Sequence, residues 1–369
     1  MRALWLVRAN LTRHPGGDTT QILHTAKALR QRGVQIDIAH SSHVDLQAYD
    51  VVHLFHLDRL WENAEHARRA RDANRPIVLS TIYWPSNEFD RGGRAGIQGW
   101  LARRLGSSTY QNLRVAQRYC MHCWERRRFP RLAAKPLSFQ RNVEELLHAA
   151  SVLLPNSRAE QSIIEQRFEL SRPAVIVPNA ADTEMFRPPD EPSAAKRDGV
   201  VCTGRIEPRK NQLALIRALR GTRIPLTLVG GPGRYSRSYY RRCQQAADDT
   251  VRFVGGCPPQ QVRNHYQTAC VHVNVSWYET PGLASLEAAL CGCAIVVTPG
   301  GSTREYLQEN AVYAQPDDPT TIREAIERAL ERGPSSELAD RVRQQYTWEA
   351  AAKMTAQAYT LAMDLHSPR

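Results

Sequence analysis

Short apolar runs alternate with amphipathic stretches along most of the chain. The first run covers residues 3–7, and Ile22, Ala26 and Leu29 then recur at spacings of four and three. Such a run predicts a buried strand, whereas the second spacing predicts a helix that ends near Gly33. Further strands are predicted at residues 34–38, 51–55, 77–80, 151–154, 174–177, 200–202, 225–229, 251–254, 271–275 and 294–297. This alternation predicts an α/β fold whose parallel sheets carry helices on both faces.

The alternation breaks in a proline-rich segment that begins at Arg187. Three prolines within five residues cannot continue a helix or a central strand. A chain of 369 residues is also long for a single hydrophobic core. Two doubly wound, Rossmann-like domains that face each other would enclose a central cleft beyond the carboxyl ends of their strands. We predict these domains at residues 1–186 and 199–346, a linker at 187–198 and a final helix at 347–369.

Positive charge is concentrated in one part of the chain. The formal net charge is +12, and residues 91–141 contain twelve Arg or Lys but a single acid, Glu125. A solvated helical face is one interpretation of this segment. Its interleaved aromatic residues favour an acidic membrane surface, with Arg126, Arg127 and Arg128 as candidate contacts. Nucleic acid would suit the charge, but no known nucleic-acid-binding motif accompanies it, so we expect no specific nucleic-acid partner.

The apolar runs and the cysteines indicate the cellular compartment of the protein. The first apolar run is cut short by Arg8, and nowhere do 18 apolar residues follow one another. The eight cysteines are scattered, and several lie in apolar strand-like runs. We therefore expect a cytoplasmic protein with reduced thiols, peripheral on the inner face of the cell membrane.

Two cations follow the first strand of the second domain. Arg205 and Lys210 lie between that strand and a helix predicted to begin at Gln212. Free N–H groups at a helix start favour anions, and the two cations could neutralise a diphosphate. Two exposed surface cations are the alternative interpretation. The glycine turn that contains Gly231 follows the next strand and is weak support alone.

Two glutamates provide the strongest candidate chemistry. Glu279 lies in the loop after a strand, and Glu287 lies about one turn into a helix predicted from about Leu283. Both carboxylates could therefore face one ligand and accept hydrogen bonds from pairs of hydroxyls, as in sugar and ribose diols. The amides of Gly282 and Leu283, at the start of the helix, could hold phosphate.

Taken together, these motifs resemble the family 4 retaining glycosyltransferases of the GT-B fold. The resemblance covers nearly the whole chain, and its specificity lies in the order and spacing of the motifs. The segments that carry it are Gly16-Gly17, residues 177–182, Gly204-Arg205 to Lys210-Asn211, Glu279 to Glu287 with Pro-Gly-Leu inside, residues 288–292, residues 298–301 with Glu305, and residues 346–349.

The resemblance implies a role for several residues. Glu279 would lie beside the donor sugar, while Arg205 and Lys210 would hold the diphosphate and stabilise its departing charge. Glu287 would bind the donor ribose. The resemblance also implies retention of anomeric configuration and an acceptor-side first domain, to which the final helix crosses back. The other donor-binding candidates are Gly282, Leu283, Gly231, Gly16 and Gly17.

Metal and first-domain chemistry complete the prediction. No Asp-x-Asp pair occurs, and Cys120 and Cys123 lack two further ligands, so we expect no metal and no cofactor besides the donor co-substrate.

Many relatives carry a histidine after the fourth strand, where this chain has none. Tyr83 could take over part of its role, or His53 and His56 could approach the site; satisfied histidines at a strand end are the alternative for the latter two.

We therefore predict a hexosyltransferase type of enzyme that transfers sugar from a nucleotide-diphosphate sugar to a lipid-linked or glycan acceptor. Its expected place is in cell-surface polysaccharide or glycoconjugate synthesis. The alternatives are a catalytically impaired nucleotide-sugar-binding protein and a basic nucleic-acid-binding protein.

Overall fold

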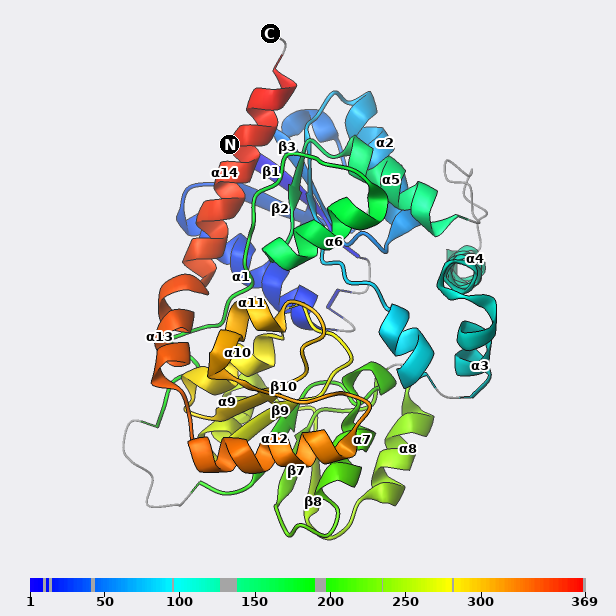
Figure 1. The fold of residues 1–369 in the computed structure, drawn as a ribbon. Helices are drawn as coiled ribbons and strands as arrows, with labels where there is room; N and C mark the ends of the chain where they lie inside the picture. The colour runs from blue at the N-terminus through cyan, green and yellow to red at the C-terminus, as the bar shows by residue number, and fades with distance from the viewer. Residues whose placement is uncertain are drawn as a thin grey trace. The chain divides into compact units, whose positions relative to one another are not determined.

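The chain forms two compact units, each with its own parallel sheet (Figure 1). The computed structural model describes residues 1–8, 11–12, 15–40, 44–94, 96–126, 138–189, 197–233, 235–280 and 282–367. The first unit contains Met1–Trp84, Trp100–Pro178 and Trp348–Arg369, and the second contains Pro85–Gly99 and Asn179–Thr347. Residues 85–99 and 179–186, which the predicted boundaries place in the first domain, thus lie in the second unit.

The first unit is built around five parallel strands in the order β2-β1-β3-β4-β5. Apolar residues of these strands are buried together, and the sheet forms the centre of this unit's core. The strand order reverses between β1 and β3, which pair directly. The strands are β1 (Arg2–Leu6), β2 (Gln35–Ala39), β3 (Val51–Phe55), β4 (Ile77–Ser80) and β5 (Val152–Leu154). The helices are α1 (Gly17–Gln31), α2 (Leu60–Asp72), α3 (Gly96–Leu105), whose first residues count with the second unit, α4 (Ser107–Arg126), α5 (Phe139–Ala149), α6 (Arg158–Phe168) and α14 (Trp348–His366).

A buried hydrogen-bond network fastens the C-terminal helix α14 to this sheet. Trp5 Nε1 donates to the Tyr359 hydroxyl at 2.6 Å, and that hydroxyl lies 2.8 Å from His53 Nδ1. His53 Nε2 lies 2.9 Å from Ser80 Oγ. Burial lowers the pKa of His53 to about 3, so the ring is neutral and one of its nitrogens donates while the other accepts. Three strands and α14 are therefore joined by buried polar groups that are hydrogen-bonded to one another.

The second unit contains six parallel strands in the order β11-β10-β9-β6-β7-β8. Read along the chain, this order is that of a dinucleotide-binding sheet, and it reverses between β6 and β9. The strands are β6 (Val200–Thr203), β7 (Leu226–Val229), β8 (Val251–Gly255), β9 (Val271–Asn274), β10 (Ala294–Val297) and β11 (Val312–Tyr313). The helices are α7 (Gln212–Leu219), α8 (Arg237–Ala246), α9 (Pro259–Thr268), α10 (Leu283–Leu290), α11 (Thr303–Leu307), α12 (Pro319–Arg332) and α13 (Ser336–Gln345). Short helical turns are η1 (Leu46–Ala48), η2 (Phe89–Gly93), η3 (Pro208–Lys210) and η4 (Gln308–Asn310).

The predicted α/β class with two parallel sheets is confirmed, whereas one strand prediction is wrong. Residues 174–177 form a single pairing, between Leu153 and Ala174, rather than a strand. The Val175 and Val177 amides donate to the carbonyls of Leu153 and Pro155, but Pro155 has no N–H with which to continue the ladder. Conversely, the two-residue edge strand β11 was too short to give an apolar signal. Most of the predicted linker lies outside the described residues.

Candidate functional site

The candidate site lies where the strand order of the second unit reverses. Strand β6 leads into the loop that contains Arg205 and Lys210, and its neighbour β9 leads into the loop that contains Glu279. Because β6 and β9 are parallel, both loops leave the same edge of the sheet. Ligands of doubly wound sheets bind in this position.

Lys210 and Glu279 form the central contact of the site. The Lys210 ammonium donates to Glu279 Oε1, and the two side chains are only 16% and 10% exposed. Although burial alone would raise the pKa of Glu279, Lys210 and Arg209 lower it to about 2. Glu279 is therefore a buried carboxylate that stays ionised at neutral pH, and it holds the lysine in place.

Arg209 ties the two loops together and was not among the predicted site residues. Its Nη1 donates to the Tyr278 carbonyl at 2.9 Å and lies 3.5 Å from Glu279 Oε1. Its own carbonyl accepts from the Trp277 amide at 3.0 Å. The guanidinium also contacts Glu207 at 3.3 Å. Arg209 thus holds the Glu279 loop against η3 through its side chain and through its backbone carbonyl.

A second turn holds the backbone of Glu279. The Glu279 amide donates to the Gly300 carbonyl at 3.1 Å, and its carbonyl accepts from the Ser302 amide at 2.8 Å. Gly301 has φ +94°, and a Cβ there would overlap the Glu279 carbonyl. Glycine is therefore required at this close approach.

Glu287 is connected to the end of β6 through a tyrosine. The Tyr266 hydroxyl lies 3.4 Å from Glu287 Oε2 and 2.6 Å from Thr203 Oγ1. Burial raises the pKa of Glu287 to about 7, and only the tyrosine hydrogen bond opposes that rise. Glu279 and Glu287 are therefore different carboxylates: the first is paired with cations, whereas burial and the charge of Asp182 disfavour the ionised form of the second.

The start of α10 is shaped by glycine. Gly282 caps this helix with φ +87° and provides no side chain that could bind its first N–H groups. A Cβ on Gly282 would lie 3.3 Å from Asn274 Nδ2 and 3.5 Å from Glu279 Cγ. The helix begins at Leu283, as the sequence predicts. Uncapped amides at a helix start favour an anion.

Arg205 and Gly231 are less constrained than the other predicted residues. The Arg205 side chain is 51% exposed and lies 3.7 Å from Glu207. Gly231 accepts from the Ile206 amide at 2.8 Å, but a Cβ on it would meet open space. The glycine that the turn requires is Gly230, where φ is +144° and a Cβ would overlap the Gly204 carbonyl.

A segment from the first half of the sequence covers the Glu279 loop within the second unit. The indole of Trp277 packs against Phe89, with ring centroids 6.5 Å apart. A Cβ on Gly92 or Gly93 would overlap the Trp277 ring. The sequence offered one signal for this contact, the paired glycines, which permit a close approach of backbone to a large ring.

The first unit has its own charged cluster where its strand order reverses. Gly16 and Gly17 begin α1 after β1, and Asp18 follows them. Arg8 Nε donates to Asp18 Oδ2 at 2.6 Å, and His56 Nε2 lies 3.3 Å from the same oxygen. Although burial opposes it, His56 and Arg8 hold the pKa of Asp18 well below its usual value. The structure thus brings His56 together with two charged residues that sequence reasoning did not select.

The remaining candidates of the first domain are of two kinds. His53 and Tyr83 are buried, and the three arginines at 126–128 lie wholly or partly outside the described residues. Both His53 nitrogens are hydrogen-bonded in the network that binds α14, and burial lowers the pKa of His53 to about 3. This placement contradicts His53 as a group that approaches a reaction centre. Tyr83 is buried, and its ring packs against Phe168. Arg127 and Arg128 lie outside the described residues, as does the side chain of Arg126.

The second unit matches a known family. The model of glycosyl transferases group 1 matches residues 197–332, which contain all six strands of the sheet and the residues around Lys210, Glu279 and Glu287. Residues 197–332 are therefore similar to a group 1 glycosyltransferase domain. The predicted family resemblance is thereby confirmed.

Curated glycosyltransferases match parts of this chain. A phosphatidylinositol N-acetylglucosaminyltransferase component of Arabidopsis thaliana is 30% identical over 196 residues, which is 51% of this chain and 44% of the relative. D-inositol 3-phosphate glycosyltransferase of Geodermatophilus obscurus is 27% identical over 335 residues, or 83% of this chain and 70% of the relative. The chain therefore spans less than half of the plant protein and about two thirds of the bacterial one.

Solved structures establish the fold around the group 1 domain. Sucrose-phosphate synthase of Thermosynechococcus elongatus has a TM-score of 0.73 at 17% identity and covers 97% of this chain and 98% of its own. Anabaena HepE in complex with UDP and glucose has a TM-score of 0.67 at 17% identity, with 98% and 99% covered. The predicted GT-B fold is confirmed.

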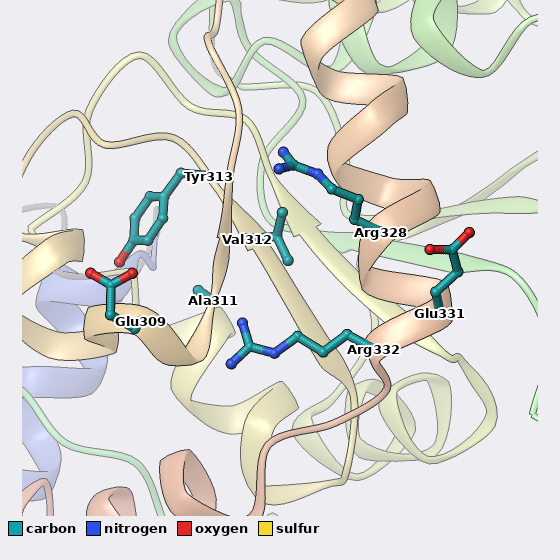
Figure 2. Close-up of a pocket in the computed structure, with 7 residues that line it drawn as sticks. All are labelled: Glu309, Ala311, Val312, Tyr313, Arg328, Glu331 and Arg332. Carbon is teal, nitrogen blue, oxygen red and sulfur yellow. The ribbon is translucent and has the colours of Figure 1, made fainter.

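One cavity lies away from these residues. It has a volume of about 610 Å³ beside the edge strand β11 and helix α12 (Figure 2). Its lining residues are Glu309, Ala311, Val312, Tyr313, Arg328, Glu331 and Arg332. None of the predicted site residues belongs to this lining, so the cavity is separate from the candidate site of the group 1 domain.

Proposed function

We propose that this chain is a retaining glycosyltransferase whose donor is a nucleotide-diphosphate sugar bound by the second unit. The observation that carries the proposal is that Lys210 and Glu279 meet at the strand-order reversal, while Glu287 is joined to the same edge through Tyr266. Cations there suit a diphosphate, and a carboxylate with few protein partners suits the ribose hydroxyls. The solved complex of HepE with UDP and glucose supports this donor class.

In the proposed reaction, the bond between the anomeric carbon and the diphosphate oxygen breaks, the acceptor hydroxyl attacks from the same face, and its proton passes to the leaving diphosphate. Lys210 and the more exposed Arg205 stabilise the charge that develops on the leaving diphosphate. The amides of Gly282 and Leu283 add to this stabilisation. Because its pKa is held at about 2, Glu279 does not donate a proton at neutral pH; it fixes Lys210 and lies beside the donor sugar. The reaction as proposed uses no metal.

We further propose a lipid-linked or glycan acceptor at the cytoplasmic face of a membrane, in cell-surface polysaccharide or glycoconjugate synthesis. The names of the two curated relatives refer to phosphatidylinositol and to D-inositol 3-phosphate, which supports a polar headgroup as acceptor. His56 with Arg8 and Asp18 is the first-unit candidate for acceptor binding. Among the described residues, no helix is both long and apolar enough to cross a membrane.

A panel of nucleotide-diphosphate sugars tests the donor class. The true donor should raise the unfolding midpoint, because a ligand at 100 times its Kd stabilises the folded state by about 2.7 kcal/mol. Donor hydrolysis or transfer should follow, and Glu279→Ala should abolish it. A shift without turnover would indicate a catalytically impaired binding protein, and no shift with any donor would refute the proposal.

Donor affinity is expected to rise between pH 6 and pH 8. Since the pKa of Glu287 is raised to about 7, the group ionises across this range, and the carboxylate accepts more hydroxyl hydrogen bonds than the acid. Titration of the donor at several pH values measures the effect. Glu287→Gln should bind more weakly at pH 8 and lose this pH dependence.

The same variant has a stability control. Because the folded pKa exceeds the ordinary 4.5, the folded state binds more protons than the unfolded state between pH 4.5 and 7, so unfolding free energy falls as pH rises through that window. In the ligand-free protein, Glu287→Gln should therefore raise the unfolding midpoint at pH 8 relative to wild type. A lower midpoint would contradict the assigned burial of this charge.

A further inference from the structure

Helix α3 exposes an unusual amount of apolar surface. Trp100 is 54% exposed and Leu105 is 38% exposed, and the same helix exposes 79% of Ile97 one turn earlier. The following helix α4 adds Leu113, which is 49% exposed. Single exposed apolar residues need no explanation, but a group of large ones within 17 residues of chain marks an interaction surface.

The polar residues around this surface are basic. Arg103 and Arg104 are exposed at the end of α3, and the Arg104 guanidinium lies over the Trp100 ring at 5.7 Å from its centroid. Residues 96–124 contain four arginines and no Asp or Glu. Ile97, Trp100 and Arg104 recur at spacings of three and four, so they occupy one face of the helix.

The combination of exposed apolar residues and arginines on α3 favours an acidic lipid surface over solvent or nucleic acid as the partner. A purely solvated face would not expose a tryptophan and an isoleucine, and a nucleic-acid groove would not require the aliphatic residues. At a lipid headgroup layer, tryptophan and aliphatic side chains enter the apolar boundary, while arginines pair with anionic headgroups.

We propose that α3 is a membrane-docking helix that inserts Ile97 and Trp100 into the headgroup boundary of an anionic leaflet, with Arg104 bound to lipid phosphates. Leu105 and Leu113 lie in the same stretch of chain, where a single residue, Gly106, separates α3 from α4. The proposal rests on the proposed function for its purpose, because docking would bring the enzyme to a membrane-held acceptor. Lipid binding itself requires no donor.

Flotation with vesicles that contain phosphatidylglycerol, compared with pure phosphatidylcholine, tests the proposal. The full chain should bind the anionic vesicles more strongly, and less so as salt increases. Arg104→Gln should weaken binding about fivefold, since one basic residue contributes about 1 kcal/mol at such a surface. Trp100→Ser should weaken it about tenfold through lost apolar burial.

Matched variants separate this surface from general stickiness. Leu365 is 53% exposed on α14, so Leu365→Ser is the control for Trp100→Ser, and the exposed Arg332 provides Arg332→Gln as the control for Arg104→Gln. The controls should bind vesicles as wild type does, and every variant should keep the donor-induced thermal shift. If no donor gave a thermal shift in any of these proteins while vesicle binding followed the expected order, the donor proposal would fail. The docking proposal would then stand.

Two results would overturn the docking proposal. One is equal binding of Trp100→Ser and wild type to anionic vesicles. The other is equal retention on RNA and on vesicles with the same salt dependence, which would reassign the surface to general polyanion binding.

Discussion

Replacing Lys210 by methionine is expected to lower transfer from the donor by about 100- to 1000-fold. Lys210 is the cation nearest Glu279 in the β6 loop, and its positive charge is the part of the site best placed to stabilise a leaving diphosphate. Methionine keeps the length and apolar stem of the side chain but removes that charge. The measurement is kcat at saturating donor and acceptor, with the exposed Lys353→Met on α14 as the matched surface control.

The same substitution also leaves Glu279 with a weaker partner, so loss of folding must be separated from loss of catalysis. Breaking a buried ion pair by removing one member costs about 3–5 kcal/mol of stability. In the double variant Lys210→Met with Glu279→Gln, no unpaired charge is buried, and the unfolding midpoint should recover. Turnover should not recover. If it did, the pair would be a structural contact rather than part of the catalytic site.

The sequence allowed the general position of this site to be predicted because its residues follow strands. An apolar run identifies a strand, and the residues after parallel strands share one edge of a sheet. This rule placed Lys210 and Glu279 in neighbouring loops, although 69 positions separate them. The start of α10 at Leu283 was predicted from a different signal, because a glycine precedes a helical apolar pattern there.

Other parts of the site depend on contacts that leave no local pattern. Arg209 stands beside Lys210 in the sequence and could have been an exposed cation, but its contact with Tyr278 makes it a buried link between loops. His53 was expected either to approach the site or to be a satisfied histidine, and the second alternative holds because Tyr359, 306 positions away, lies 2.8 Å from its Nδ1. Such pairings follow from how helices and strands pack, which periodicity along the chain does not encode.

The glycines illustrate the same limit. Gly231 was selected because it lies in a glycine-rich turn, yet a Cβ on it would meet open space. Gly301 was named only as part of the family motif at residues 298–301. The structure nevertheless requires glycine at this position more strictly than at Gly231. A glycine is constrained by its backbone angle and by the nearest atom, and the sequence shows neither.

Gly301→Ala is therefore expected to destabilise the second unit by about 2–4 kcal/mol and to abolish turnover. At φ +94° an L-residue is strained, and the added methyl would overlap the Glu279 carbonyl. The turn must then move away from Glu279, breaking the hydrogen bonds from the Glu279 amide to Gly300 and from the Ser302 amide to Glu279. Thermal unfolding measures the first effect, and donor-dependent turnover well below the midpoint measures the second.

Gly256→Ala is the matched control, because the same methyl is added in the same unit with no atom beyond its chain neighbours within 4 Å. It should change the unfolding midpoint and turnover little. A Gly301→Ala protein that keeps its midpoint but loses turnover would show that the turn yields at small cost and that the position of Glu279 alone limits catalysis. A variant indistinguishable from Gly256→Ala in both measurements would contradict the close approach itself. The assignment of Glu279 as a carboxylate fixed by its own backbone would then lose its basis.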